Sequence, residues 1–121
     1  MLKPLTQPFK DGVALFYLVK NIANAGNLPK EALEERIPNA LPYDELKVGI
    51  TRFWSASQEH SKIERLLRFP RVDQVKREDV TIPIDGEQYK IVQIQYPPEV
   101  NPPCMDLSLE RLEVAYEIRT G

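Results

Sequence analysis

His60 and Cys104 are the side chains best suited to acid–base or nucleophilic chemistry, and each is the only residue of its type. A Ser-His-Asp or Cys-His arrangement would have to use His60. Cys104 lies in VNPPCM, which is not the sequence context of an activated nucleophile. One histidine and one cysteine also exclude a histidine-rich metal site, an internal disulfide and a cysteine metal cage. We therefore expect no catalytic residue, no cofactor and no metal site, and we interpret His60 as a surface or interface residue.

Carboxylates gather at two places, Glu31, Glu34 and Glu35 in one and Asp44 and Glu45 in the other. Such oxygen ligands suit Ca²⁺ or Mg²⁺, but their spacing matches no metal-binding loop. We interpret them as solvated charges and as helix N-terminal charges. The chain also lacks the glycine patterns of phosphate-binding loops.

Several residues are candidates for contact with a protein partner. They are Trp54, Arg65, Arg68, Arg71, Pro97, Pro98, Pro102 and Pro103. The arginines form the main basic concentration, which could contact a phosphate or a partner, or simply be the solvated face of an edge element. The prolines could dock as a polyproline II segment or form a stiff loop between two strands. Trp54 could fill the core or form an interface hot spot.

Length and composition describe the scaffold that must position these residues. The chain has 121 residues, a net charge of -2, 42% hydrophobic and 28% charged residues, as in a soluble globular domain. The charge argues against a general nucleic-acid or membrane-surface binder. The single cysteine suggests a reducing compartment. Eleven prolines divide the chain into short elements, and we expect an extended N-terminal arm over 1–11 and a single β-barrel domain over 12–121.

The strongest local signal is Asp85-Gly86, which lies between alternating apolar runs in VTIPIDGEQYKIVQIQY, residues 80–96. A two-residue type I′ hairpin turn needs positive φ at both central positions, which glycine and aspartate tolerate. This turn predicts the cross-strand pairs Ile84 with Glu87, Ile82 with Tyr89, and Val80 with Ile91. In that register the missing N–H of Pro83 faces away from the 87–96 strand, so we expect the 80–84 strand to be a sheet edge.

Two changes of parity indicate a barrel. The apolar set moves from Tyr89 and Ile91 to Val92, Ile94 and Tyr96. It moves again from Leu107 and Leu109 to Leu112, Val114, Tyr116 and Ile118. A strand that keeps one face buried can do this only through a bulge or a change of sheet. The predicted fold class is therefore mainly β, a small antiparallel β-barrel.

Other elements follow from periodicity. Residues 13–22 predict a strand with two largely apolar faces, which we expect to be central or covered. Residues 29–36 predict one short helix, because Pro29 suits the first helical position and Leu33 and Ile37 are four apart. Residues 43–70 favour strand, bend and strand, although Ile63, Leu66 and Leu67 fit a helix equally well, which leaves 53–67 open.

Four blocks carry a resemblance to a known family. They are YDELKVGITRFWSA (43–56), RLLRFPR (65–71), DGEQYKIVQIQYPPE (85–99) and PPCMDLSLERL (102–112). On these blocks the chain resembles the head–tail joining, or head-closure, proteins of long-tailed bacteriophages and prophages, also called connector or adaptor proteins. The likeness is clearest over 43–118.

The resemblance implies a small β-barrel structural subunit that joins a ring between portal and tail. The implied partners are a portal or adaptor protein, tail proteins and further copies of the chain. We expect no membrane partner, and we expect DNA contact to be only indirect, through the connector channel. It implies a virion component assembled in the bacterial cytoplasm, with no active site to transfer. The long insert typical of plug loops is not obvious here, which leaves open whether the subunit gates the channel.

An alternative function fits the same residues. A small β-barrel could bind a protein or peptide as a minor capsid or tail component. On either hypothesis we expect the contact surfaces to be the arm at 1–11, the loop at 97–105 and the segment at 65–77.

Overall fold

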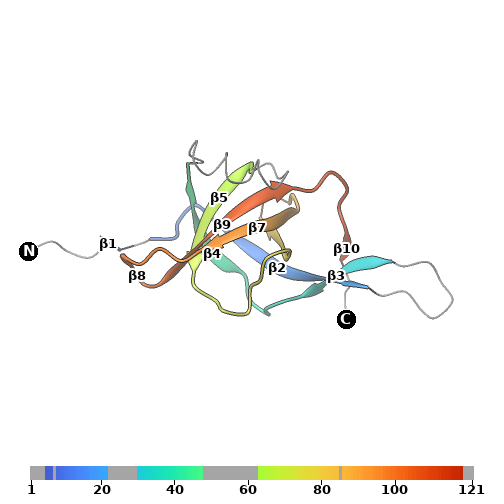
Figure 1. Cartoon of the computed structure of the whole chain (residues 1–121), viewed down its shortest axis with the longest axis horizontal. Coiled ribbons are helices and arrows are strands. Elements are labelled where there is room, and N and C mark those ends of the chain that lie inside the picture. The colour runs from blue at the N-terminus through green and yellow to red at the C-terminus, as the bar shows by residue number, and fades with distance from the viewer. Residues whose placement is uncertain (1–4, 7, 22–29, 48–62, 85, 119–121) are drawn as a thin grey trace, which may run out of the picture.

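The computed structural model describes residues 5–6, 8–21, 30–47, 63–84 and 86–118. Its elements within these ranges are all β strands (Figure 1). They are β1 (Leu5–Thr6), β2 (Gly12–Asn21), β3 (Glu31–Glu35), β4 (Leu41–Leu46), β5 (Arg65–Pro70), β6 (Val80–Pro83), β7 (Tyr89–Gln95), β8 (Val100–Asn101), β9 (Cys104–Arg111) and β10 (Glu117–Ile118).

Six of these strands close into an antiparallel barrel. Their order is β2-β4-β5-β9-β7-β6, and β6 pairs back onto β2. The predicted fold class, a mainly β antiparallel barrel, is therefore confirmed. Because the sheet closes on itself, none of its six strands is left as a simple edge.

Strand β2 is long enough to serve three partners. Its start, Gly12–Ala14, pairs with β4, its middle, Ala14–Tyr17, pairs with β6, and its end, Tyr17–Asn21, pairs with β3. Beyond the barrel, β2 and β3 continue as a ribbon, which β10 joins in parallel (Figure 1, right). At the other end of the view, β1 and β8 form a separate two-stranded sheet.

The barrel is filled by alternate residues of its strands, as the two-residue period of a strand requires. Phe69 lies at the centre, with ring centroids 5.0 Å from Phe16 and 5.5 Å from Tyr43. The core cluster comprises Ala14, Phe16, Tyr43, Leu67, Phe69, Val75, Tyr89, Ile91, Met105, Leu107 and Leu109.

The predicted helix over 29–36 is wrong. Residues 31–35 form β3, and its Val19–Leu33 pairing with β2 buries Ala32 and Leu33. Pairing and burial outweigh a local helix preference, which is a weak term. For the 53–67 segment, which the sequence left open between strand and helix, the structure shows a strand at Arg65 to Leu67, which belong to β5. Residues 53–62 lie outside the described residues.

The predicted hairpin connects β6 to β7, but its register is wrong by one residue. Val80 pairs with Lys90 and Thr81 with Tyr89. The N–H of Gly86 donates to the Pro83 carbonyl over 2.8 Å, and Gly86 has a φ of 96°. A glycine in the left-handed region after the turn makes the connection one residue longer than a type I′ turn. Asp85 itself lies outside the described residues.

The expectation that the 80–84 strand is an edge is also wrong. Strand β6 pairs with β7 on one side and with β2 on the other, and Pro83 is buried opposite Ala14. The N–H of Ile84 donates to the Val13 carbonyl over 3.0 Å. Backbone groups alternate in direction, so the Pro83 nitrogen faces β7, where the ladder already ends at Thr81. The proline is tolerated because no ladder bond is required of it there.

The two parity changes have different causes. The change in β7 is a bulge between Ile91 and Gln93, as predicted, and it leaves Val92 buried outside the main core cluster. The later change follows the end of β9 at Arg111, after which the chain leaves the barrel and β10 pairs with β3. This second change is therefore a change of partner.

Gly12 supplies a direct test of the packing, because it lies against the Tyr43 ring. A Cβ on Gly12 would lie 2.5 Å from the Tyr43 hydroxyl oxygen and 2.7 Å from Cζ. We predict that Gly12→Ala lowers the free energy of unfolding by about 1–3 kcal/mol, as overpacking does, measured by urea denaturation. The loss should be smaller in a Tyr43→Phe background, which lacks the nearest atom. Equal losses in both backgrounds would contradict this packing.

Candidate interaction surface

The barrel carries a row of apolar side chains on its outer face, which we call the apolar ladder. It consists of Val13 and Leu15 on β2, Ile82 on β6 and Ile84 just after β6: Leu15 pairs with Ile82, and the N–H of Ile84 donates to the Val13 carbonyl. The next pair in register, Tyr17 with Val80, is not part of this open row, because Val80 is only 1% exposed. The intervening residues Ala14 and Phe16 face the core, so the ladder faces outward. Leu15 is 42% exposed and Ile84 is 79% exposed.

The ladder forms one wall of a shallow groove of about 390 Å³. The described residues that line it are Val13, Ala14, Leu15, Ala40, Ile82, Pro83, Ile84 and Gly86, and none of these is charged. Exposed large apolar residues that are grouped rather than scattered mark sites of protein contact. The groove is therefore the candidate interaction surface.

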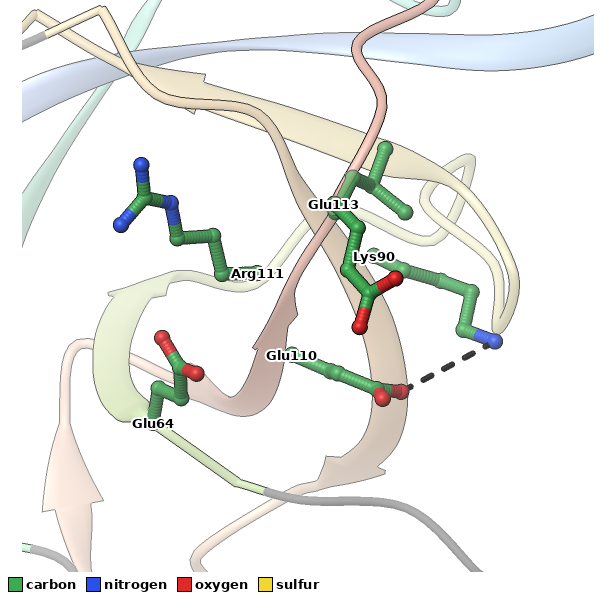
Figure 2. Close-up of a pocket in the computed structure, with 6 residues that line it drawn as sticks. Glu64, Lys90, Glu110, Arg111 and Glu113 are labelled. Carbon is green, nitrogen blue, oxygen red and sulfur yellow. Dashed lines mark ion pairs between the residues drawn. The ribbon is translucent and has the colours of Figure 1, made fainter.

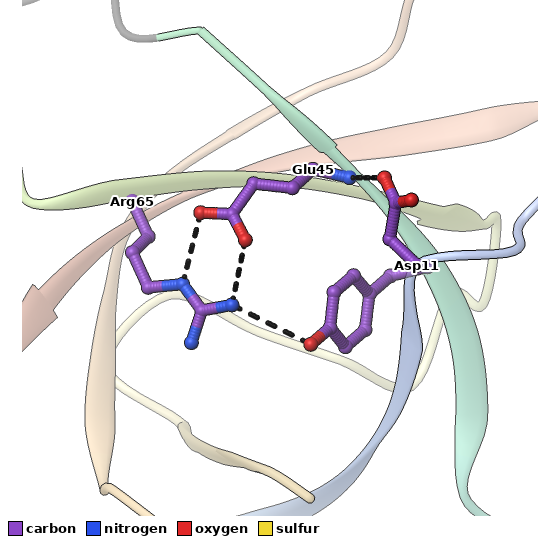
Figure 3. Close-up of polar contacts among 4 residues, drawn as sticks. Asp11, Glu45 and Arg65 are labelled. Atoms are coloured by element: carbon purple, nitrogen blue, oxygen red, sulfur yellow. Dashed lines mark hydrogen bonds and ion pairs between the residues drawn. The ribbon is translucent and has the colours of Figure 1, made fainter. Parts of the chain in front are cut away.

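Arg65, by contrast, closes one end of the barrel (Figure 3). Its Nε and Nη2 lie 3.1 and 2.8 Å from the two Glu45 carboxylate oxygens, and Nη2 donates to the Tyr43 hydroxyl over 3.4 Å. Its guanidinium carbon lies 5.9 Å from the Tyr43 ring centroid and 5.3 Å from that of Tyr89. Hydrogen bonding to Glu45 raises the pKa of Arg65. Asp11 extends the network by accepting the Glu45 N–H over 2.8 Å.

Arg68 lies on the outer face, in a row with two carboxylates. Asp44, Arg68 and Asp106 are neighbours in register on β4, β5 and β9. Arg68 makes a bidentate contact with Asp106, at 2.7 and 2.9 Å, which raises the pKa of Arg68. Asp44 accepts the N–H groups of Phe9 and Lys10 over 2.8 and 2.7 Å. This row therefore fastens the N-terminal residues to the barrel wall.

Arg71 is the most exposed of the three arginines and meets the proline segment. It lies 4.2 Å from the Tyr96 ring centroid, its Nε lies 3.2 Å from Asp73, and its N–H donates to the Pro103 carbonyl over 3.0 Å. Pro98, Pro102 and Pro103 are exposed and Pro97 is half-buried. The structure thus brings Arg71 and the prolines together and separates them from Arg65. Trp54 and His60 lie outside the described residues.

Cys104 is buried at the start of β9. Its thiol lies 3.1 Å from the Pro102 carbonyl oxygen, to which it donates. Burial raises the pKa of the thiol, which lowers its thiolate fraction at neutral pH. Cys104 is therefore a packing residue of low reactivity.

A second, larger hollow of about 640 Å³ has charged walls (Figure 2). Its lining residues are Glu64, Lys90, Glu110, Arg111, Leu112 and Glu113. Lys90 lies 3.9 Å from Glu110, and Arg111 lies 3.2 Å from Glu87. Among the described residues, no three His, Cys, Asp or Glu side chains are grouped to hold a metal ion. Its described lining carries three carboxylates and two cationic groups, so both signs of charge are present on its walls.

The apolar ladder is the feature that sequence reasoning missed. The sequence signal for the ladder was the pair of largely apolar faces of residues 13–22, but such a pattern predicts a strand that is covered on both sides. The strand is indeed central, but its outer face at Val13 and Leu15 is open. Only the pairing with β6, distant in sequence, places Ile82 and Ile84 beside them.

Comparison with known proteins does not assign this chain to a family. No protein-family model matches it, and no curated protein sequence is significantly similar to it. In the part of the chain that the structure describes, no helix is long and apolar enough to span a bilayer. The function must therefore be argued from the surface and from the sequence blocks.

The Arg68–Asp106 pair should be structural, because both side chains are largely buried, at 18% and 9% exposure. We predict that Asp106→Ala lowers the free energy of unfolding by about 1–3 kcal/mol, since it removes both hydrogen bonds that a largely buried guanidinium makes to Asp106 and leaves Asp44 as its neighbouring carboxylate. Asp73→Ala is the matched control, because Asp73 pairs with exposed Arg71 and is 82% exposed, and it should change stability little. Similar losses for the two variants in urea denaturation would contradict the structural role.

The exposed side chains of the apolar ladder should contribute little to the stability of the fold. We predict that Ile84→Asp changes the free energy of unfolding by no more than about 0.5 kcal/mol, as for exposed positions. Phe16→Ala, one layer inward, should lower it by about 3–5 kcal/mol. Thermal and urea denaturation measure both changes. A loss of several kcal/mol for Ile84→Asp would show that the ladder belongs to the core.

Proposed function

We propose that this chain is a structural subunit of a phage or prophage head–tail connector, which assembles as a ring between portal and tail. The observation that carries the proposal is the apolar ladder and its groove, whose described lining residues are all uncharged. A monomeric barrel that closes its own core has no folding requirement for exposed aliphatic side chains in register on its wall. An assembly subunit does require such a surface, because it must bury one when it joins its neighbours.

The projecting ribbon also supports a role in assembly. Strands β2, β3 and β10 extend beyond the barrel (Figure 1), so the subunit is longer than its core requires. Two surface ion pairs, Lys20 with Glu34 and Lys30 with Glu117, link the three strands at 3.1 and 2.9 Å. An ordered extension of this kind increases the surface over which a ring subunit can contact its neighbours.

The resemblance and the ladder support different parts of the proposal. The blocks 65–71, 85–99 and 102–112 correspond to β5, β7 and β9, which build the barrel. No residue of the ladder falls within these blocks. The resemblance therefore supports the scaffold, whereas the ladder is the surface that would select this subunit's own partners.

The proposed partners are a portal or adaptor protein, tail proteins and further copies of the chain, within a virion assembled in the bacterial cytoplasm. The second candidate function, a barrel that binds a protein or peptide, is favoured by the groove itself. Its volume of about 390 Å³ suits a short apolar segment. The two functions differ in whether the chain binds a portal ring.

Mixing the chain with the portal ring encoded by the same genome tests the proposal. We predict a complex in sedimentation and in electron micrographs, and at least a tenfold weaker association for Ile84→Asp than for Asp73→Ala, because only the first places a charge in the groove. A chain that stays monomeric and does not bind the portal would contradict the proposal. Binding of a short apolar peptide without portal binding would favour the second function.

A further inference from the structure

The segment that follows β9 is clamped at both ends by one residue, Gln88. The Gln88 carbonyl accepts the N–H of Leu112 over 3.0 Å. Its side-chain amide then meets the backbone of Tyr116 twice, accepting the N–H over 2.8 Å and donating to the carbonyl over 2.9 Å. Gln88 is only 9% exposed, so the clamp is part of the folded barrel.

The clamp presents an apolar side chain to solvent. Val114 lies midway between the two clamped residues and is 82% exposed. Ile118 follows on β10 and is 40% exposed. We call Val114 and Ile118 the knob. Because the backbone on both sides of Val114 is already fixed, docking it would require little further ordering.

The knob and the groove contain five of the six exposed large hydrophobic residues among the described residues. Six large hydrophobic residues are exposed there: Val13, Leu15, Ile84, Tyr96, Val114 and Ile118. Three line the groove and two form the knob, while Tyr96 stacks on Arg71. None of the described residues that line the groove is charged, so their side chains suit aliphatic side chains of the kind that the knob presents.

We infer that the Val114–Ile118 knob of one copy docks into the Val13–Leu15–Ile84 groove of a second copy. This inference rests on the proposed function and names the contact between neighbouring subunits. The groove lies on β2 and β6, whereas the knob follows β9 and reaches β10 beside β3 (Figure 1). Two different surfaces meet, so the contact is head-to-tail, and its repetition produces a ring or a filament.

The size of the groove limits the strength of this contact. A hollow of about 390 Å³ takes only a few side chains, so the contact falls below the standard size of a stable interface. Two isolated subunits should therefore associate weakly. On an assembling ring each subunit uses its knob and its groove together, which raises the effective concentration of each contact.

Disulfide trapping tests the contact with the full chain alone. The double variant Val114→Cys, Ile84→Cys should form disulfide-linked dimers, trimers and higher multimers when oxidised at high protein concentration. Cys104 is buried and should not contribute. The matched control is Val114→Cys, Asp73→Cys, because Asp73 is as exposed as Ile84. Multimers no more abundant than in the control would overturn the inference.

A mixing experiment provides a second, independent readout by analytical ultracentrifugation. Val114→Asp removes the knob and Ile84→Asp blocks the groove, so each variant alone should stay monomeric. Their mixture should form heterodimers but nothing larger, because one intact knob and one intact groove remain. If the mixture forms no heterodimer at concentrations where the natural chain associates, the head-to-tail contact is wrong. A chain that joins the portal but fails both tests would refute this contact while the proposed function stands.

Discussion

The pairing of β2 with β6 is the constraint on which the rest of the structure depends. It closes the barrel, and its register places Ala14 opposite Pro83 and Phe16 opposite Thr81 on the inside. The same register puts Leu15 beside Ile82 on the outside. Side chains of a strand alternate strictly, so a slip of one residue would exchange the two faces. The core and the apolar ladder are therefore two consequences of one register.

The charged residues explain why the ladder is distinct from the remaining surface. Arg65 and its partners close one end of the barrel, while Arg68 with Asp106 and Asp44 hold the wall on which the N-terminal residues lie. These side chains are engaged with the barrel itself. Among the described residues of the groove on β2 and β6, no side chain is charged, and the exposed surface there is mainly apolar. This contrast between a charged, internally paired surface and an apolar wall supports the proposed contact with other proteins through that wall.

Much of the fold could be predicted from local patterns, and the failures share a physical cause. The long strand predicted at 13–22, the turn at Gly86 and the bulge after Ile91 all follow from alternation and turn chemistry, and the structure has a strand at Gly12–Asn21, a turn at Gly86 and a bulge after Ile91. The predicted hairpin register was wrong because the turn is one residue longer than a type I′ turn. The predicted helix was wrong because long-range pairing with β2 makes residues 31–35 a strand. The partners of the arginines and the groove also depend on strands distant in sequence. A local pattern can identify the residues of a site without showing which of them meet.

The central proposal is that the outer face of β2 and β6 is buried when the chain is assembled. The most direct measurement is solvent paramagnetic relaxation of the methyl groups of Leu15, Ile82 and Ile84 in the isolated chain and in its portal-bound assembly. We predict strong relaxation of these methyls in the isolated chain and protection in the assembly, with the core methyls of Leu107 and Leu109 shielded in both. Equal relaxation of the ladder methyls in the two states would contradict it.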